Sequence, residues 1–170
     1  MLTLFHAPQS RSSRIVWLLE EIGVDYDLRC VDIFRSMTGT GGRDPANLHP
    51  DGKVPALLHG DALVTESAAV ALYLTDLFPE AGLGASVGSA ERAAYVTWLA
   101  WAAGEMEPAY WGKVSGQVDG DPMAQARYDA VIARLFGALE RGPYLMGERF
   151  TAVDVMVGSA LAWGRDFSPS

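Results

Sequence analysis

Cysteine is nearly absent from this 170-residue sequence, in which Cys30 stands alone. A single thiol excludes an internal disulfide, a CxxC redox pair and a cysteine-rich zinc site. Histidine is also scarce, and His6, His49 and His59 are too widely spaced to indicate a metal cluster. We therefore expect neither a bound metal nor a dithiol redox centre.

An excess of basic residues is also missing, because 13 lysines and arginines stand against 21 aspartates and glutamates, a formal net charge of -8. This charge repels phosphate backbones and anionic lipids, so we expect no nucleic-acid and no membrane partner. No apolar run approaches the length of about 18 residues that a transmembrane helix needs, and the start does not resemble a secretory signal. We expect a soluble, cytoplasmic, globular protein.

The first half of the sequence alternates between strand and helix patterns. Apolar runs or strict alternation indicate strands over residues 2–5, 26–32, 54–59 and 62–65. Helical spacing follows the first strand, where Ser10 or Ser12 is placed to cap a helix that stops at Gly23. A second helix is opened by Glu66 and Ser67 and ends at Pro79. The predicted order is βαβ, then a loop over 36–52 with at most one short helix, then ββα.

The second half shows only helical patterns. Residues 79–88 hold three glycines and one proline with few large side chains, which is typical of a linker. We therefore predict domains over 1–78 and 89–170. In the second domain, Thr151 and Asp154 form a variant of the capping box before an apolar helix. Over residues 164–170 we expect no further helix.

Four short motifs, together with this element order, resemble the glutathione S-transferase family over almost the whole chain. They are a Ser/Arg-rich turn at 10–14, the segment 52–57, Glu66-Ser67 at a helix start, and the motif 151–154. The resemblance implies an α/β thioredoxin-like N-terminal domain and an all-α C-terminal domain. Family members continue beyond the helix that follows Asp154, so it also implies a shortened, apparently truncated helical domain.

Glutathione binding by named residues is implied by the same resemblance. In the family, the proline that corresponds to Pro55 is cis, and the residue before it, here Val54, pairs with the cysteinyl backbone of glutathione. Ser67 would hold the γ-glutamyl carboxylate and Glu66 would face its ammonium group. Lys53 is a candidate for the glycyl carboxylate, with solvated surface charge as the equal alternative.

The alternative readings of these positions are an ordinary strand-initiating proline and a plain helix cap. For His49 we favour a solvated surface position.

Catalysis in the family requires ionisation of the glutathione thiol, which a hydroxyl at the first helix N-terminus promotes. Ser10 is the first candidate and Ser12 the second, and Arg11 offers positive charge. Cap formation alone is the competing role of Ser10. Cys30 lies too late in the chain for the cysteine-type mechanism of the family, and we expect it in the core.

The resemblance implies an enzyme that conjugates glutathione to a small hydrophobic electrophile, acts in detoxification and forms a homodimer. Tyr110 and Trp111 are candidates for the electrophile pocket, with packing as an equal alternative. The rival hypothesis is a non-catalytic glutathione-binding or regulatory module of the same fold. A thioredoxin-type oxidoreductase is disfavoured because residues 8–13 contain no cysteine.

Overall fold

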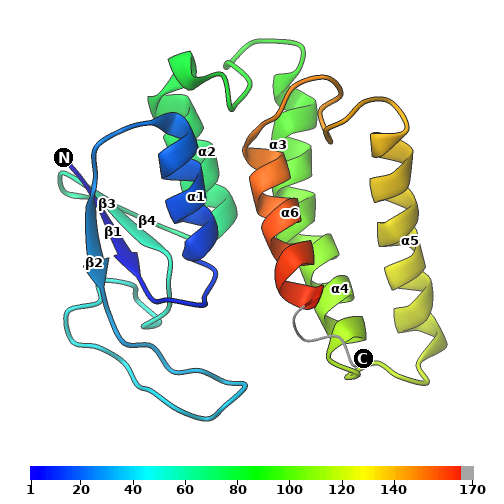
Figure 1. The fold of residues 1–170 in the computed structure, drawn as a ribbon, viewed down its shortest axis with the longest axis horizontal. Helices are drawn as coiled ribbons and strands as arrows, with labels where there is room; N and C mark the ends of the chain where they lie inside the picture. Colours follow the sequence, from blue (N-terminus) through cyan, green and yellow to red (C-terminus); the bar gives the residue numbers. More distant parts are fainter. Residues whose placement is uncertain (166–170) are drawn as a thin grey trace. The chain divides into compact units, whose positions relative to one another are not determined.

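The chain folds into two compact units in the computed structural model, which describes residues 1–165 (Figure 1). The first unit is Met1–Ala81, and the second begins at Gly82. Each unit has its own core of buried apolar residues.

A four-stranded mixed sheet with the order β2-β1-β3-β4 forms the centre of the first unit. β1 and β2 are parallel, whereas β1 with β3 and β3 with β4 are antiparallel. The strands are β1 (Leu2–His6), β2 (Asp27–Cys30), β3 (Ala56–His59) and β4 (Ala62–Thr65). The predicted βαβ and ββα order is confirmed.

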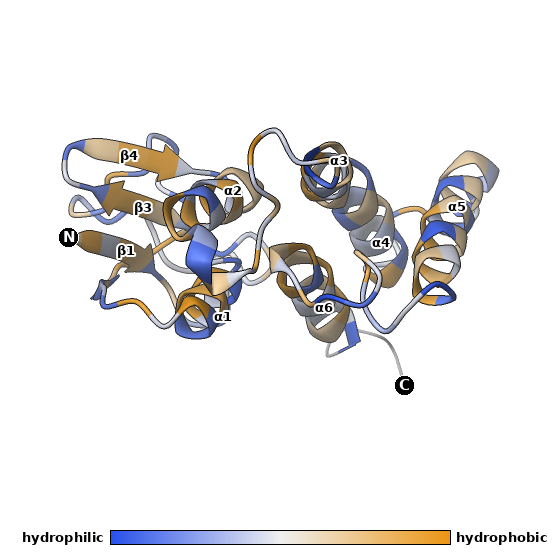
Figure 2. Ribbon diagram, turned by 90° about the horizontal axis from the view of Figure 1, so that it is seen from above, coloured by the Kyte–Doolittle hydropathy of each residue, from blue (hydrophilic) through white to orange (hydrophobic). Residues whose placement is uncertain are grey.

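Two helices, α1 (Ser13–Ile22) and α2 (Ser67–Leu77), pack together on one face of this sheet (Figures 1 and 2). They bury the apolar stripes that the sequence indicated, with Ile15, Leu18 and Leu74 fully inaccessible to solvent. Gly23 ends α1 at a positive φ of 73°, where its N–H bonds to the carbonyl of Leu19. This layer holds the ends of the strands in fixed positions.

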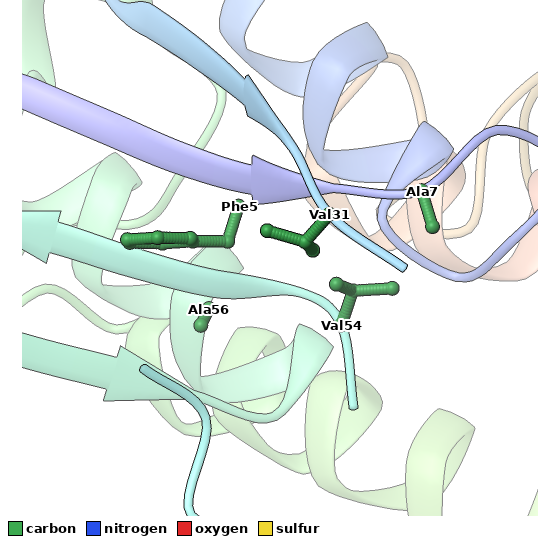
Figure 3. Packing of buried hydrophobic residues seen from close by; sticks show 5 residues of the cluster. All are labelled: Phe5, Ala7, Val31, Val54 and Ala56. Atoms are coloured by element: carbon green, nitrogen blue, oxygen red, sulfur yellow. The ribbon is translucent and has the colours of Figure 1, made fainter. Parts of the chain in front are cut away.

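The opposite face of the sheet carries a second apolar cluster, which Figure 3 shows from close by. It consists of Phe5, Ala7, Val31, Val54 and Ala56, with Ile33 and Leu58 packed against it. Since Ala7 follows β1 and Val54 precedes β3, the cluster fixes these two chain segments beside each other. The segment after β2 contributes Val31 and Ile33 and thereby covers this face.

The second strand differs from the prediction. All four residues of β2 are exposed, and Cys30 is an exposed free thiol, so the expectation of a core cysteine is wrong. The physical reason is the strand order, because β2 lies at the edge of the sheet. β3 also begins later than predicted, at Ala56, since Pro55 has no N–H to donate to a neighbouring strand.

The second unit is helical, with α3 (Arg92–Trp101), α4 (Glu107–Val114), α5 (Pro122–Leu139) and α6 (Ala152–Arg165). A π-helical turn, Ala102–Met106, joins α3 to α4. It contains Gly104, and Pro108 follows in the first turn of α4. α6 packs against α3 and α4, and α5 packs against α4. α6 itself extends through Gly164 and Arg165, and the rest of the stretch in which we expect no further helix, 166–170, lies outside the described residues.

The capping box at the start of α6 is confirmed. Asp154 accepts hydrogen bonds from the backbone N–H and the hydroxyl of Thr151, at 2.8 and 3.2 Å. Its other oxygen accepts from the N–H of Leu145 at 2.8 Å. The carboxylate therefore fixes both the helix start and the loop before it.

Candidate functional site

Three of the predicted motifs meet at one end of the strands in the first unit, which we call the site border. Phe5 pairs with Ala56, and Ala56 pairs with Thr65. Because β3 runs antiparallel to both β1 and β4, the end of β1, the start of β3 and the end of β4 lie side by side. The turn after His6, the segment before Ala56 and the start of α2 therefore form one continuous border.

The segment before β3 presents a free stretch of backbone at this border. The Val54–Pro55 peptide bond is cis. The Val54 side chain is buried in the apolar cluster, whereas no hydrogen bond within residues 1–165 reaches its N–H or C=O. Those two groups are therefore available to an extended peptide, in the way that one strand offers its edge to another.

Two buried polar side chains support this segment from the preceding loop. Asn47 donates through Nδ2 to the carbonyl of Lys53 at 2.9 Å and accepts through Oδ1 from the N–H of His49. His49 in turn accepts through Nδ1 from the N–H of Asp51 at 3.0 Å. A network of this kind fixes the path of the chain directly before Val54.

The surface position expected for His49 is wrong, because only 3% of the residue is exposed. Burial lowers its pKa, and the carboxylates of Asp51 and Glu66 oppose that effect. Sequence reasoning missed Asn47 altogether, because an asparagine in a loop indicates a turn and not a buried strut. Lys53, by contrast, is exposed, and its Nζ lies 3.7 Å from Oδ2 of Asp51.

Glu66 occupies a backbone conformation that residues other than glycine rarely adopt, with φ 67° and ψ 122°. Its side chain is exposed, makes no capping hydrogen bond and has no hydrogen-bond or ion-pair partner within residues 1–165. Ser67 then begins α2, where the first N–H groups have no acceptor inside the helix. A helix start with free N–H groups beside an unpaired carboxylate suits a ligand that carries both a negative and a positive group.

The serines after β1 have different environments. Ser12 is fully buried and occupies the cap position of α1, but its side chain makes no capping bond. Its hydroxyl instead lies 2.8 Å from Nδ1 of His6 and 2.7 Å from Oγ of Ser10. Ser10 is half-buried and donates to the carbonyl of Ala7 at 2.6 Å. Side-chain capping, predicted for one of these serines, is therefore replaced by a cluster of hydroxyls.

The turn that carries Ser10 is held from outside by a residue that sequence reasoning missed. Arg35 donates to the carbonyls of Pro8 and Gln9, at 2.9 and 3.3 Å. Gln9 has a positive φ of 53°. The guanidinium thus bonds the carbonyls before and after the positive φ of Gln9. Arg11, further along the same turn, is exposed.

Comparison with known proteins agrees with this geometry. Residues 10–77 match the model of the glutathione S-transferase N-terminal domain. Over 163 residues the chain is 30% identical to glutathione S-transferase GstA of Escherichia coli O157:H7, covering 94% of this chain and 81% of that protein. The chain belongs to the glutathione S-transferase family.

Other known proteins match over a similar length. The disulfide-bond oxidoreductase YfcG of Escherichia coli K12 is 31% identical, with 91% of this chain and 76% of that protein covered. A glutathione S-transferase structure from Actinobacillus pleuropneumoniae is 31% identical with a TM-score of 0.81, covering 98% of this chain and 79% of that one. A sphingomonad glutathione S-transferase, solved in complex with glutathione, is 26% identical with a TM-score of 0.76, covering 99% and 85%.

These findings confirm the fold class, a thioredoxin-like domain followed by a helical one. They also support glutathione-dependent transferase activity as the general function, since that activity names the family. No helix within residues 1–165 is long and apolar enough to cross a membrane.

Tyr110 and Trp111, the candidates for the electrophile pocket, lie on α4 in the second unit. Tyr110 donates to the carbonyl of Leu161 at 3.3 Å and stacks on Tyr128, and burial together with Tyr128 raises its pKa. The ring of Trp111 lies 5.9 Å from that of Trp163. These contacts favour the packing alternative for both residues.

Proposed function

We propose that this chain is a glutathione transferase that holds glutathione along the border formed by the end of β1, the start of β3 and the end of β4, and that activates the glutathione thiol with the Ser10 hydroxyl. The observation that carries the proposal is that Val54, Glu66-Ser67 and Ser10 converge on this border of strand ends. Each of the three offers polar groups of the kind that a γ-glutamyl tripeptide needs.

The γ-glutamyl end is assigned to the start of α2. Its carboxylate would accept from the hydroxyl and N–H of Ser67, where the helix dipole favours an anion. Its ammonium group would face the unpaired carboxylate of Glu66, which is exposed for such a contact. The cysteinyl residue would then bond to the free N–H and C=O of Val54, and Lys53 would face the glycyl carboxylate.

The thiol is assigned to Ser10. Of the two candidate hydroxyls, that of Ser12 is buried and surrounded by His6, Ala7 and Ser10, whereas Ser10 is partly accessible. A hydroxyl that donates to sulfur stabilises the thiolate, and the thiolate is the nucleophile. Attack of the thiolate on a small hydrophobic electrophile forms the new carbon–sulfur bond as the leaving group departs.

Isothermal calorimetry with reduced glutathione tests the binding site. Ser67→Ala should raise the Kd about tenfold or more, because it removes a hydrogen bond to a charged group. Ser10→Ala should leave the Kd nearly unchanged and lower the rate of conjugation to chlorodinitrobenzene. Ser13→Ala is the matched control, since Ser13 is exposed at the start of α1 and has no assigned contact with the tripeptide.

Two rival functions predict other outcomes. A non-catalytic module would bind glutathione, with the same loss in Ser67→Ala, but would conjugate no electrophile. A disulfide-bond oxidoreductase, the activity for which YfcG is named, would reduce a glutathionylated peptide faster than it conjugates chlorodinitrobenzene. Failure of the folded wild-type protein to bind glutathione would refute the proposal as a whole.

A homodimer is also inferred from the family resemblance alone. Sedimentation velocity at micromolar concentration tests this inference, and a monomer throughout the range would contradict it.

A further inference from the structure

We propose that His6 is a positioning residue of the thiol-activating site, which acts through Ser12 to orient and polarise the hydroxyl of Ser10. The inference rests on the proposed function, because it assigns a support to the residue that faces the thiol. It adds a side chain from the first strand that no sequence motif indicated.

The three side chains form a continuous hydrogen-bonded chain. Nδ1 of His6 lies 2.8 Å from Oγ of Ser12, and that oxygen lies 2.7 Å from Oγ of Ser10. Both distances are those of well-formed hydrogen bonds. The chain leads from the last residue of β1 through a fully buried hydroxyl to a half-buried one.

The hydroxyl of Ser12 also lies 3.4 Å from the carbonyl of Ala7, which is longer than its contacts with His6 and Ser10. If those two shorter contacts each hold a proton, two arrangements remain. A hydroxyl has one proton and two lone pairs, and the N–H of Ala7 donates to this oxygen at 3.2 Å. One lone pair and one proton therefore remain for His6 and Ser10. Either His6 donates to Ser12 and Ser12 donates to Ser10, or both bonds run in the opposite direction.

The environment of Ser10 selects the first arrangement. Its own proton points to the carbonyl of Ala7 at 2.6 Å, and its oxygen accepts from the N–H of Ser12 at 3.2 Å. The remaining lone pair of Ser10 faces Ser12, so Ser12 is the donor and His6 carries its proton on Nδ1. Burial lowers the pKa of His6, which agrees with a neutral ring holding that single proton.

This direction suits thiol activation. Each hydrogen bond that an oxygen accepts strengthens the bond that its own O–H donates, by about 10–30%. With two donors behind it, the Ser10 hydroxyl needs only to rotate from the Ala7 carbonyl to the sulfur. In the opposite arrangement the proton of Ser10 points to Ser12, and its rotation to the sulfur would leave no proton between the two hydroxyl oxygens.

Three variants, one of them a matched control, test the hydrogen-bonded chain from His6 to Ser10. His6→Phe keeps an aromatic ring of similar size but removes Nδ1, whereas His6→Asn restores a donor near the same position. His59→Phe is the control, because His59 also ends a strand of this sheet and lies 2.9 Å through Nδ1 from the hydroxyl of Tyr73. His59 lies at the opposite end of the strands from His6, because β3 runs antiparallel to β1 and His59 pairs with Leu2.

The readouts are the pKa of the bound glutathione thiol, followed by the ultraviolet absorbance of the thiolate, and kcat for conjugation. His6→Phe should raise that thiol pKa and lower kcat by about five- to tenfold, the size expected for one lost hydrogen bond. The Kd for glutathione should change less than about threefold, because binding is assigned to other residues. His6→Asn should restore most of the loss, and His59→Phe should match the wild type.

Two results would overturn the inference and leave the proposed function standing. One is a folded His6→Phe variant whose bound thiol pKa and kcat equal those of the wild type. The other needs no variant: long-range nitrogen–proton NMR of the wild-type imidazole that finds the proton of His6 on Nε2. Absence of glutathione binding by the wild type would refute both proposals together, so the two failures are distinguishable.

Discussion

Replacing Glu66 with glycine should separate the backbone of this residue from its carboxylate. A residue other than glycine in such a rare region of φ and ψ costs about 1–3 kcal/mol, and φ at Glu66 is 67°. Glycine removes that cost but loses about 0.5–1 kcal/mol more chain entropy on folding. The net expectation is a gain of about 1 kcal/mol in the free energy of unfolding.

Glu66→Ala is the matched variant, because alanine also lacks the carboxylate but keeps the strained backbone. Since the side chain makes no capping bond, its removal affects both variants equally, and their difference reports the backbone alone. For a chain of this length, the melting temperature of Glu66→Gly should exceed that of Glu66→Ala by about 2–4 °C. Urea titration measures the corresponding free energies.

Glutathione binding should respond in the opposite way to stability. Both variants lose the carboxylate assigned to the γ-glutamyl ammonium, so calorimetry should show a Kd raised about tenfold or more in each. A Glu66→Gly protein no more stable than Glu66→Ala would refute the strain argument. A glycine variant that binds glutathione as tightly as the wild type would refute the role of the carboxylate.

Arg35→Ala should loosen the turn around Gln9 and lower kcat for conjugation severalfold, with less effect on the Kd for glutathione, as steady-state kinetics and calorimetry would show; equal kcat values would contradict this role. Burial holds the pKa of His49 below its ordinary value of 6.5, so the unfolded chain takes up the proton first as pH falls. The contribution of His49 to the free energy of unfolding is therefore complete above pH 6.5 and declines below it. His49→Asn keeps an acceptor for the N–H of Asp51 and should flatten this decline, as urea titrations at a series of pH values below 6.5 would show. An unchanged dependence of the unfolding free energy on pH would exclude His49 as its source. Cys30→Ser should leave conjugation and the melting temperature unchanged, because the thiol is exposed on an edge strand; loss of thiol–disulfide exchange in this variant would instead support the oxidoreductase reading.

Much of the fold could be predicted because its signals are local. Helical spacing with Gly23 and Pro79 as stops, and alternation on both sides of Gly60-Asp61, placed the helices and the hairpin near their observed bounds. Thr151 and Asp154 meet within a single helical turn, so their hydrogen bonds follow from sequence spacing. The environment of β2 could not be found in this way, because an edge strand and a central one carry similar alternation.

For the candidate site too, local motifs predicted some features and only the structure supplied the others. Val54, Glu66 and Ser67 could be named from motifs, whereas the free backbone of Val54 and the rare dihedral angles of Glu66 required the structure. His49 was misplaced because hydrophobicity alone puts a histidine in a loop on the surface. Its hydrogen bonds reach only two residues along the chain, to Asn47 and Asp51, and such a turn pattern does not indicate that the folded loop buries the ring.

The sequence by itself therefore determined the order of the elements, the family and the short motifs that we assign to glutathione, since all of these depend on neighbours along the chain. Only the tertiary structure decided which side chains support those motifs. Arg35 reaches Pro8 across 27 residues of sequence, and His6 reaches Ser10 only through the buried Ser12. The first contact arises because the parallel pairing of β1 with β2 brings the segments after these strands together, and the second because the turn after β1 folds Ser12 back onto His6. The strength of the second contact comes from the burial of Ser12, which exists only after the chain has folded.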